Sequence, residues 1–220
     1  MPPITATTTA PASLHGWRLF SLLALLVIVA TALALLWQPQ LVEALRSAIR
    51  VTARTSFALF LLAFLASSLA LLVPSPTTRA LLRERRFFGL AFAFSHLIHG
   101  VLILTYAQLF PELFWNGRSA ATNIPGSVGY LFILLLALTS FPWAMKALGG
   151  RGWKALHSTG SWVLAVIFCL SFYKRIPMSP GYVLAFGLMF SAIVLKLVAK
   201  LAQRVRRNAQ PARTSLATAR

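Results

Sequence analysis

The chain has 220 residues, of which 58% are hydrophobic and only 11% charged, and it carries a net charge of +18. Soluble domains hold about 25% charged residues, so this composition indicates a protein that lies in a lipid bilayer. The three acidic residues (Glu43, Glu84 and Glu112) are too few for nucleotide-metal or paired-carboxylate chemistry, and a lone Cys169 excludes an internal disulfide and a four-cysteine iron–sulfur cluster.

Six apolar stretches approach the roughly 20 residues that a helix needs to cross the hydrocarbon core of a membrane. They cover residues 17–37, 56–73, 87–110, 127–148, 153–173 and 181–201. The segments between them, such as VPSPTTR, GGRG and KRIPMSPG, hold the proline, glycine and charged residues that end helices and favour water. We therefore predict an all-α, multi-pass membrane protein with six transmembrane helices within residues 17–202.

The two ends of the chain differ from this apolar middle. Residues 1–16 are rich in threonine, alanine and proline, so we expect this segment to be disordered and His15 to have no role. The first apolar stretch exceeds the about 7–15 residues of a signal-peptide core, which favours a retained helix over a cleaved leader. Residues 203–220 are basic, and we expect this tail to lie along anionic lipid headgroups.

The distribution of basic residues predicts the orientation in the membrane. With a cytoplasmic N-terminus, fifteen of the 21 lysines and arginines lie on the cytoplasmic side and six on the other. Cytoplasmic loops of membrane proteins carry an excess of these residues, so we predict that both termini are cytoplasmic. The same topology accounts for the net charge without a nucleic-acid partner.

Three histidines lie within the apolar stretches. His96 and His99 are one helical turn apart, and His157 has Gly160 and Ser161 one turn further along its own face, where a small residue leaves room for a flat ring system. Ionisable residues inside a membrane indicate a functional site, and imidazole is a common axial ligand of haem. A neutral histidine that bonds a serine or a carbonyl of the next helix explains the same pattern.

Two segments resemble a known family. RRFFGLAFAFSHLIH resembles the RRxLGLxAFxYxxLH segment of ferric-reductase-like transmembrane domains, and GYLFILLLALTSFPWAMKALGGRGWKALH resembles their GYxxLxxLALTS…LG…WxxLH segment. The resemblance covers residues 50–175 and is greatest to the haem-binding membrane subunits of bacterial periplasmic methionine sulfoxide reductase systems. It implies a six-helix bundle of the bacterial inner membrane that binds b-type haem, a single one or more, and passes electrons across the membrane.

The resemblance implies that His99 and His157 bind the haem iron. Arg85 falls where some family members have a further histidine, and Leu170 falls where members have another. Counted along their helices, His157 lies about 6 Å and His99 about 18 Å from the cytoplasmic end, an offset that is large for two ligands of one iron. Three outcomes stay open: His99 pairs with His157, His96 pairs with His157, or the haem is lost.

The resemblance also implies partners for the bound haem. Its propionates would need cations at the cytoplasmic face, where Arg85, Arg86, Arg151 and Lys154 lie, although positive-inside topology explains these residues as well. No GxGxxG motif is present, so the donor would be a separate flavin reductase or a quinol, and the acceptor a periplasmic oxidoreductase. A membrane scaffold without haem and a small transporter are the alternative interpretations.

Overall fold

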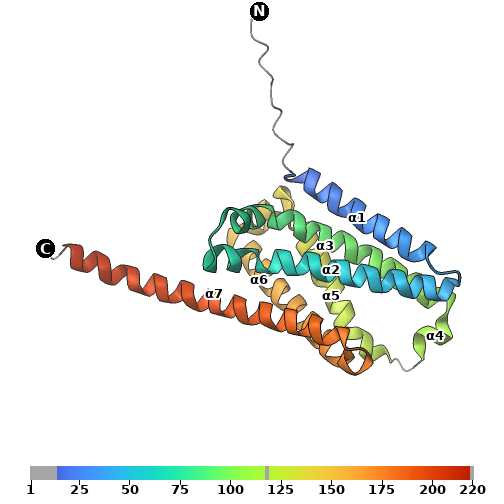
Figure 1. Ribbon diagram of the computed structural model, residues 1–220. Helices are drawn as coiled ribbons and strands as arrows, with labels where there is room; N and C mark the ends of the chain where they lie inside the picture. The colour runs from blue at the N-terminus through green and yellow to red at the C-terminus, as the bar shows by residue number, and fades with distance from the viewer. Residues whose placement is uncertain (1–13, 117–118, 219–220) are drawn as a thin grey trace, which may run out of the picture.

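The computed structural model describes residues 14–116 and 119–218. Its regular elements in these ranges are helices (Figure 1): α1 (Trp17–Leu36), α2 (Leu41–Leu72), α3 (Pro76–Leu109), α4 (Pro111–Trp115), α5 (Ala120–Leu138), α6 (Pro142–Arg175), η1 (Ile176–Met178) and α7 (Gly181–Thr218). Six of them, all but α4 and η1, are long and apolar enough to cross a membrane, which confirms the predicted all-α fold and the six spans. The predicted disorder of residues 1–13 lies outside the described residues.

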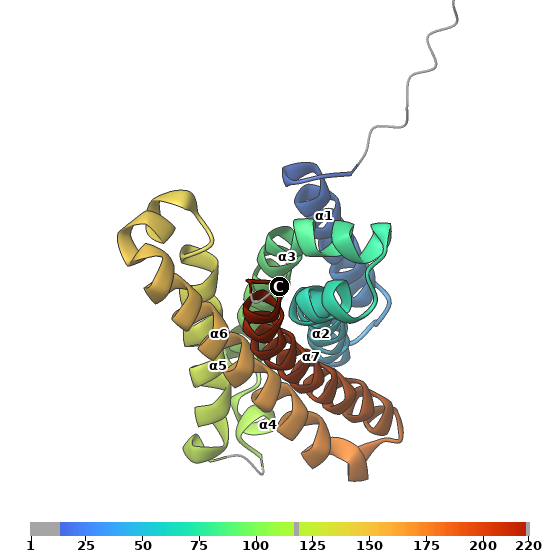
Figure 2. The ribbon, with the colours of Figure 1, turned by 90° about the vertical axis from the view of Figure 1, so that its left-hand side faces the viewer.

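The α2–α3 hairpin forms the centre of the bundle and makes its most extensive helix contact. α1 packs against both of these helices, and α7 packs against α2. α6 packs against α5 and α7, while α5 also reaches α3. Figure 2 shows that α1 and the α5–α6 pair lie on different sides of the hairpin. The elements that carry the predicted histidines, α3 and α6, therefore belong to different layers.

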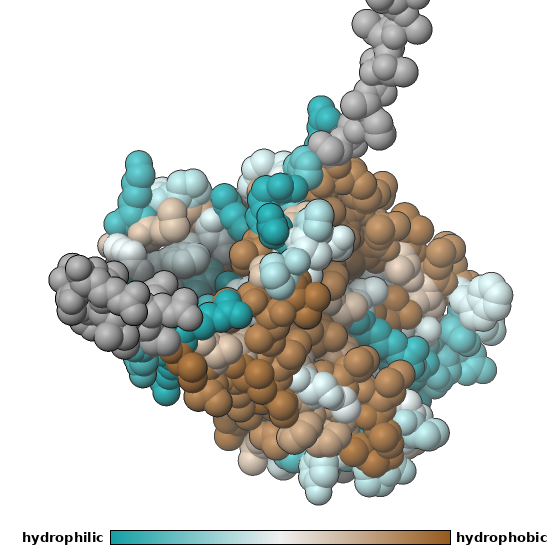
Figure 3. Space-filling view, turned by 60° about the vertical axis from the view of Figure 1, so that its left-hand side comes forward, coloured by the Kyte–Doolittle hydropathy of each residue, from teal (hydrophilic) through white to brown (hydrophobic). Residues whose placement is uncertain are grey.

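The outer surface of the bundle is apolar, as expected for helices that face lipid tails. Figure 3 shows a broad hydrophobic area with hydrophilic residues gathered at its margins. Large apolar side chains such as Leu104, Leu184 and Leu197 are more than half exposed. The hydrophobic effect does not penalise this exposure in a bilayer, so the described residues support a multi-pass membrane protein.

Phenylalanine side chains fill the space between the central hairpin and α6. The ring centroid of Phe60 on α2 lies 5.3 Å from that of Phe92 on α3 and 5.1 Å from that of Phe168 on α6. Phe168 also lies 5.7 Å from Phe57 and 5.9 Å from Phe172. Such ring pairs contribute about 0.5–1.5 kcal/mol each beyond the area that they bury. The aromatic cluster therefore joins α2, α3 and α6.

Two helices begin earlier than predicted because they extend beyond the hydrocarbon layer. α2 begins at Leu41 rather than at residue 56, and its first turns include Arg46, which bonds Glu43 at 2.9 Å and the Tyr106 hydroxyl at 3.1 Å. α3 begins at Pro76 rather than at residue 87, behind a capping box of Ser75 and Thr78. Counting apolar residues measures the membrane-crossing part of a helix and misses these polar turns.

The boundary between α5 and α6 was also predicted wrongly. The chain turns at residues 139–141 rather than at GGRG, because Pro142 starts a helix readily and Ser140 folds back to bond the Leu136 carbonyl at 2.7 Å. Gly149 interrupts α6 with φ of 66°, a conformation that glycine adopts without strain. The break predicted at GGRG is therefore present, and it separates a short helix that begins at Pro142 from the long helix that carries His157.

The last helix continues past its predicted end at residue 201. α7 runs to Thr218 and includes Arg204, Arg206 and Arg207. Nine residues without proline or glycine follow Leu201, and the alanine, glutamine and arginine among them are good helix formers. The basic residues of the tail are therefore presented along a helix.

One end of the bundle concentrates positive charge. α3 begins there, α2 ends there, and the second half of α7 passes alongside. We call it the basic end, and it is defined by Arg83, Arg85, Arg86, Lys196 and Lys200.

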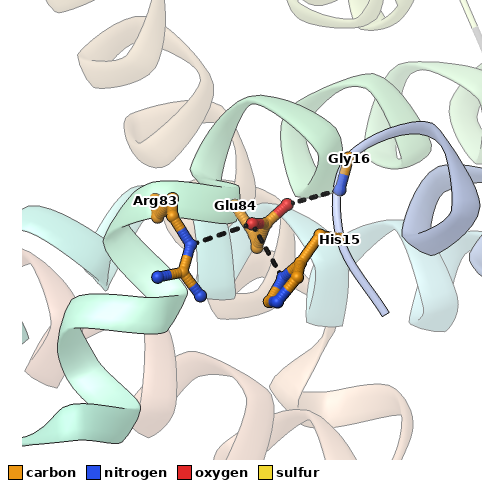
Figure 4. A network of polar contacts seen from close by, with 4 residues as sticks. All are labelled: His15, Gly16, Arg83 and Glu84. Carbon is orange, nitrogen blue, oxygen red and sulfur yellow. Dashed lines mark hydrogen bonds and ion pairs between the residues drawn. The ribbon is translucent and has the colours of Figure 1, made fainter. Parts of the chain in front are cut away.

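The first helix is fixed to the basic end by Glu84 of α3, whose side chain is 7% exposed (Figure 4). One carboxylate oxygen accepts the backbone N–H of Gly16 at 2.8 Å. The other lies 3.3 Å from Nδ1 of His15 and accepts a bond from Arg83 at 3.2 Å. His15 was expected to have no role, and this expectation is wrong, since the residue contacts the carboxylate that positions α1.

Replacing Glu84 by alanine is expected to lower the free energy of unfolding by about 2 kcal/mol, because the Gly16 N–H loses a charged acceptor in a partly buried place. Thermal unfolding of the detergent-solubilised chain measures this change. The exposed Glu112 offers a matched control, and Glu112→Ala should leave the unfolding temperature unchanged. Equal unfolding temperatures for all three proteins would contradict the anchoring role of Glu84.

Candidate functional site

His99 of α3 is held by α2 through one ring nitrogen. Its Nδ1 lies 3.1 Å from the carbonyl oxygen of Ile49 and 3.0 Å from the hydroxyl of Thr52. A carbonyl only accepts, and the Thr52 hydroxyl already donates to the Ala48 carbonyl at 2.8 Å. Both contacts therefore require the proton on Nδ1. The lone pair of His99 is then on Nε2, for which the described residues supply no hydrogen-bond partner.

A chain of hydroxyl groups next to His99 fixes the register of α2 against α3. Ser95, which is fully buried, lies 2.9 Å from the hydroxyl of Ser56 and 3.0 Å from that of Thr55. It also donates to the Thr52 carbonyl at 3.3 Å. Hydrogen bonds between membrane helices contribute about 0.6 kcal/mol each, so this cluster holds the imidazole of His99 in place cooperatively.

His96 lies beside His99 with no such attachment. Its ring centroid is 5.0 Å from that of His99 and 4.9 Å from that of Tyr130 on α5. Its Nδ1 is buried and has no hydrogen bond. Among the described residues it is the one buried side-chain nitrogen or oxygen of this kind. Gly100 allows this approach, because a Cβ there would lie 3.0 Å from the Tyr130 ring. A buried nitrogen without a partner is costly, so His96 is a candidate for a bond to a further group.

His157 of α6 bonds in a different direction, towards α5. Its Nε2 lies 2.9 Å from the hydroxyl of Thr139, which itself donates to the Leu135 carbonyl at 2.6 Å. Thr139 therefore accepts from His157, and Nε2 carries the proton. Trp153 stacks on the imidazole at 4.3 Å and donates its indole N–H to the Thr139 carbonyl at 2.9 Å. In this arrangement the lone pair of His157 is on Nδ1.

The structure brings His96 and His99 together and leaves His157 at another level of the bundle. The residue of α6 that faces His96 is Phe168, with ring centroids 6.2 Å apart. Phe168 follows His157 by about 16 Å of helix at 1.5 Å per residue. His157 therefore does not lie face to face with either histidine of α3. The offset in depth that the sequence predicts is present in the folded chain.

Two other residues of α6 bear on the space beside the histidines. Gly160 was expected to leave room for a flat ring system, but a Cβ there would lie 3.1 Å from the side chain of Leu136. The small residue therefore allows close packing of α5 on α6. Leu170, at the position where the family has a histidine, is 53% exposed and faces outward.

The predicted cationic residues divide into two groups. Arg85 donates its Nε–H to the Ala63 carbonyl at 3.0 Å and is partly buried. Arg86 lies over the rings of Phe87 and Phe141 at 5.5 and 5.9 Å, while Arg151 and Lys154 are exposed. Of these four cations, Arg85 is the one that bonds a backbone carbonyl of another helix.

Several residues of the site were missed in the sequence. Thr52 and Ile49 lie outside the span predicted for α2, and Thr139 was assigned to the interior of a helix. The LALTS segment that contains Thr139 was a usable signal, because it belongs to the same motif as His157.

The hydrogen bonds around His99 are those expected of an imidazole that binds a metal through its other nitrogen. A hydrogen bond from Nδ1–H to a backbone carbonyl fixes the orientation of such a ligand and raises its basicity. His157 fits less directly, because its Nε2 is committed to Thr139. The described residues contain no group of three or more histidine, cysteine or acidic side chains for a protein-only metal site. A single oriented imidazole is the kind of protein ligand that haem iron takes.

Comparison with known proteins supports this assignment. The family described as ferric reductase like transmembrane component matches residues 52–168, which is more than half of the chain. A curated relative from Azospira oryzae, the protein-methionine-sulfoxide reductase heme-binding subunit MsrQ, is 35% identical over 58% of this chain and 54% of the relative. The chain thus matches about half the length of this relative. The family match contains all three membrane histidines and ends before α7.

The two hydrogen-bonded histidines are expected to be opposite tautomers. In nitrogen NMR of the labelled protein without added metal, His99 should be protonated at Nδ1 and His157 at Nε2, because each proton is needed by an acceptor on the neighbouring helix. Assignment by His99→Gln and His157→Gln variants makes the measurement specific. A His99 signal with an unprotonated Nδ1 would contradict the bond to Ile49.

Proposed function

The chain belongs to the family of ferric reductase like transmembrane components, and from that membership we propose that it is a haem-binding membrane subunit that transfers electrons across the bilayer. The similarity to a heme-binding subunit supports the cofactor, since this chain keeps histidines in both matched segments. Haem supplies one-electron redox chemistry when bound. The chain would then be an oxidoreductase component that needs a donor and an acceptor.

The single observation that carries this proposal is the state of His99. Its Nδ1–H is held by Ile49 and Thr52, so an Nε2 lone pair is presented inside the membrane in a fixed orientation. A histidine whose Nδ1–H is held by a backbone carbonyl has the orientation and basicity expected of a metal ligand. We propose that His99 is the principal residue that would hold the iron of a b-type haem.

His157 is the second ligand that we propose, at the level nearer the basic end. Its bond to Thr139 orients the ring in the absence of iron and would be exchanged for the metal bond. His96, with its unbonded Nδ1, is the alternative partner. His99 and His157 lie at different depths, so each could bind the iron of a different haem. The number of haems would then depend on which of these histidines are ligands.

The side chains around these ligands have separate tasks. The phenylalanines of α2, α3 and α6 exclude water from the histidines, which favours a low-dielectric path for electrons. Arg85 is the cation best placed for a propionate, because it is partly buried beside α2. Arg86, Arg151 and Lys154 are exposed and would supply positive charge at the surface.

The proposed orientation places the basic end in the cytoplasm, in accordance with the positive-inside rule. Electrons would enter there from a separate flavin reductase or from a membrane quinol. They would leave at the opposite end to a periplasmic oxidoreductase. We place the protein in the bacterial inner membrane with both termini on the cytoplasmic side.

A membrane scaffold without haem is a second candidate, and one observation favours it. Phe168 faces His96 where a second ligand of the same iron would be expected, and Thr139 occupies Nε2 of His157. Under this interpretation the histidines serve only helix packing. The absorption spectrum distinguishes the two candidates.

Detergent-purified protein from a haem-replete host is expected to show a Soret band, with α and β bands on reduction. His99→Ala should lower the absorbance per protein at least about tenfold, the loss typical of removing a residue that supports metal binding. His157→Ala and His96→Ala identify the other ligand by which of them changes the reduced spectrum.

His15→Ala is the matched control, because this histidine lies at the bundle surface and bonds Glu84. It should retain the full spectrum. A colourless wild-type protein that takes up no added haem would contradict the proposed cofactor. An unchanged spectrum for His99→Ala would contradict the ligand assignment.

A further inference from the structure

Two cationic side chains from different helices bond adjacent carbonyl groups of α2 at the basic end. Arg85 of α3 donates to the Ala63 carbonyl at 3.0 Å, and Lys196 of α7 donates to the Phe64 carbonyl at 2.7 Å. The Lys196 ammonium also lies 4.0 Å from the centroid of the Phe64 ring. Lys196 is only 9% exposed, which is unusual for a lysine.

A third cation lies one helical turn further along α7. Lys200 is exposed, and its ammonium lies 4.8 Å from the centroid of the Trp162 ring on α6. The charges of Arg85 and Lys200 both act on Lys196, so the three groups share one neighbourhood. We call Arg85, Lys196 and Lys200 the cation cluster. Its members lie on α3 and α7 and contact α2 and α6, and two of them lie outside the segment matched by the family.

No carboxylate of the described residues balances this cluster. Glu84, the acidic residue of the basic end, is directed towards Gly16, His15 and Arg83. Glu43 and Glu112 lie at the opposite end of the bundle, in the first turns of α2 and α4. A carbonyl satisfies one hydrogen-bond donor of each cation and neutralises none of the charge. Partly buried cations without a counter-charge are destabilising, so an anion is expected beside them.

The depth of the cluster indicates which anion is available. α2 has 32 residues and is therefore about 48 Å long, against a hydrocarbon thickness of about 30 Å. Arg85 directly precedes the apolar stretch of residues 87–110, and Lys196 and Lys200 lie near the end of the stretch 181–201, so the cluster lies at the boundary of the hydrocarbon layer at the basic end. Side chains that start there reach the level of lipid phosphates, as snorkelling lysines and arginines do.

We propose that Arg85, Lys196 and Lys200 form a binding site for the phosphate of an anionic phospholipid in the leaflet at the basic end. The free guanidinium nitrogens of Arg85 suit paired bonds to phosphate oxygens, and the two ammonium groups add charge from the α7 side. Basic sites between membrane helices bind anionic headgroups in this way. The lipid would fasten α7 to α2 and α3. This inference goes beyond the proposed electron transfer and does not depend on haem.

Native mass spectrometry tests the site with the full chain, released from nanodiscs of equal parts phosphatidylglycerol and phosphatidylcholine. The wild type is expected to retain phosphatidylglycerol in preference to phosphatidylcholine. Lys200→Gln should lower the retained phosphatidylglycerol about fivefold, the loss that corresponds to one cation near an anionic lipid. Arg85→Gln and Lys196→Gln should each lower it at least as much. Lys200 is exposed, so its variant tests the site even if Lys196→Gln fails to fold.

Arg79→Gln is the matched control, because Arg79 is an exposed cation of the same end outside the cluster. It should retain as much phosphatidylglycerol as the wild type. Excess inorganic phosphate should leave the bound lipid in place, because free phosphate lacks the acyl chains. Equal retention of the two lipids by the wild type, equal losses in Arg79→Gln and Lys200→Gln, or displacement by phosphate would each overturn the proposal.

Discussion

Backbone carbonyl groups of α2 accept hydrogen bonds from ionisable side chains of the helices packed around it. Ile49 accepts from His99, Ala63 from Arg85 and Phe64 from Lys196. Lipid tails offer no hydrogen-bond partners, so a polar side chain within a membrane helix must find its partner on another helix. The carbonyl oxygens of an intact helix retain a lone pair for this purpose. α2 therefore determines how α3 and α7 are rotated about their axes.

This constraint separates the two histidine systems of the protein. His99 is oriented from α2, while His157 is oriented from α5 through Thr139. Phenylalanine rings, rather than polar groups, fill the distance between α3 and α6 at the level of His96. A change in the packing of α5 would therefore reach His157 directly, and would reach His99 only through Tyr130 and His96. The two imidazoles are therefore oriented by separate hydrogen bonds from different helices.

The six spans could be predicted from the sequence because hydropathy measures the same transfer of side chains into lipid that positions the helices. The histidines of α3 and α6 could be identified as candidate ligands because two motifs resemble those of the family. The bonds around them could not be predicted, since Thr139 and Lys196 have no periodic pattern and their roles depend on how neighbouring helices are rotated. The turn after α5 was missed because the glycines of GGRG are a stronger local signal than Pro142, although Pro142 begins the helix.

The bond between Gly16 and Glu84 joins residues that are 68 positions apart. A ribosome produces the first helix well before the third, so α1 enters the bilayer before the carboxylate that holds it has been synthesised. Until α3 arrives, α1 has only its apolar surface to keep it in place. Its final position is therefore acquired late in biosynthesis, when the central hairpin closes and Glu84 comes within reach.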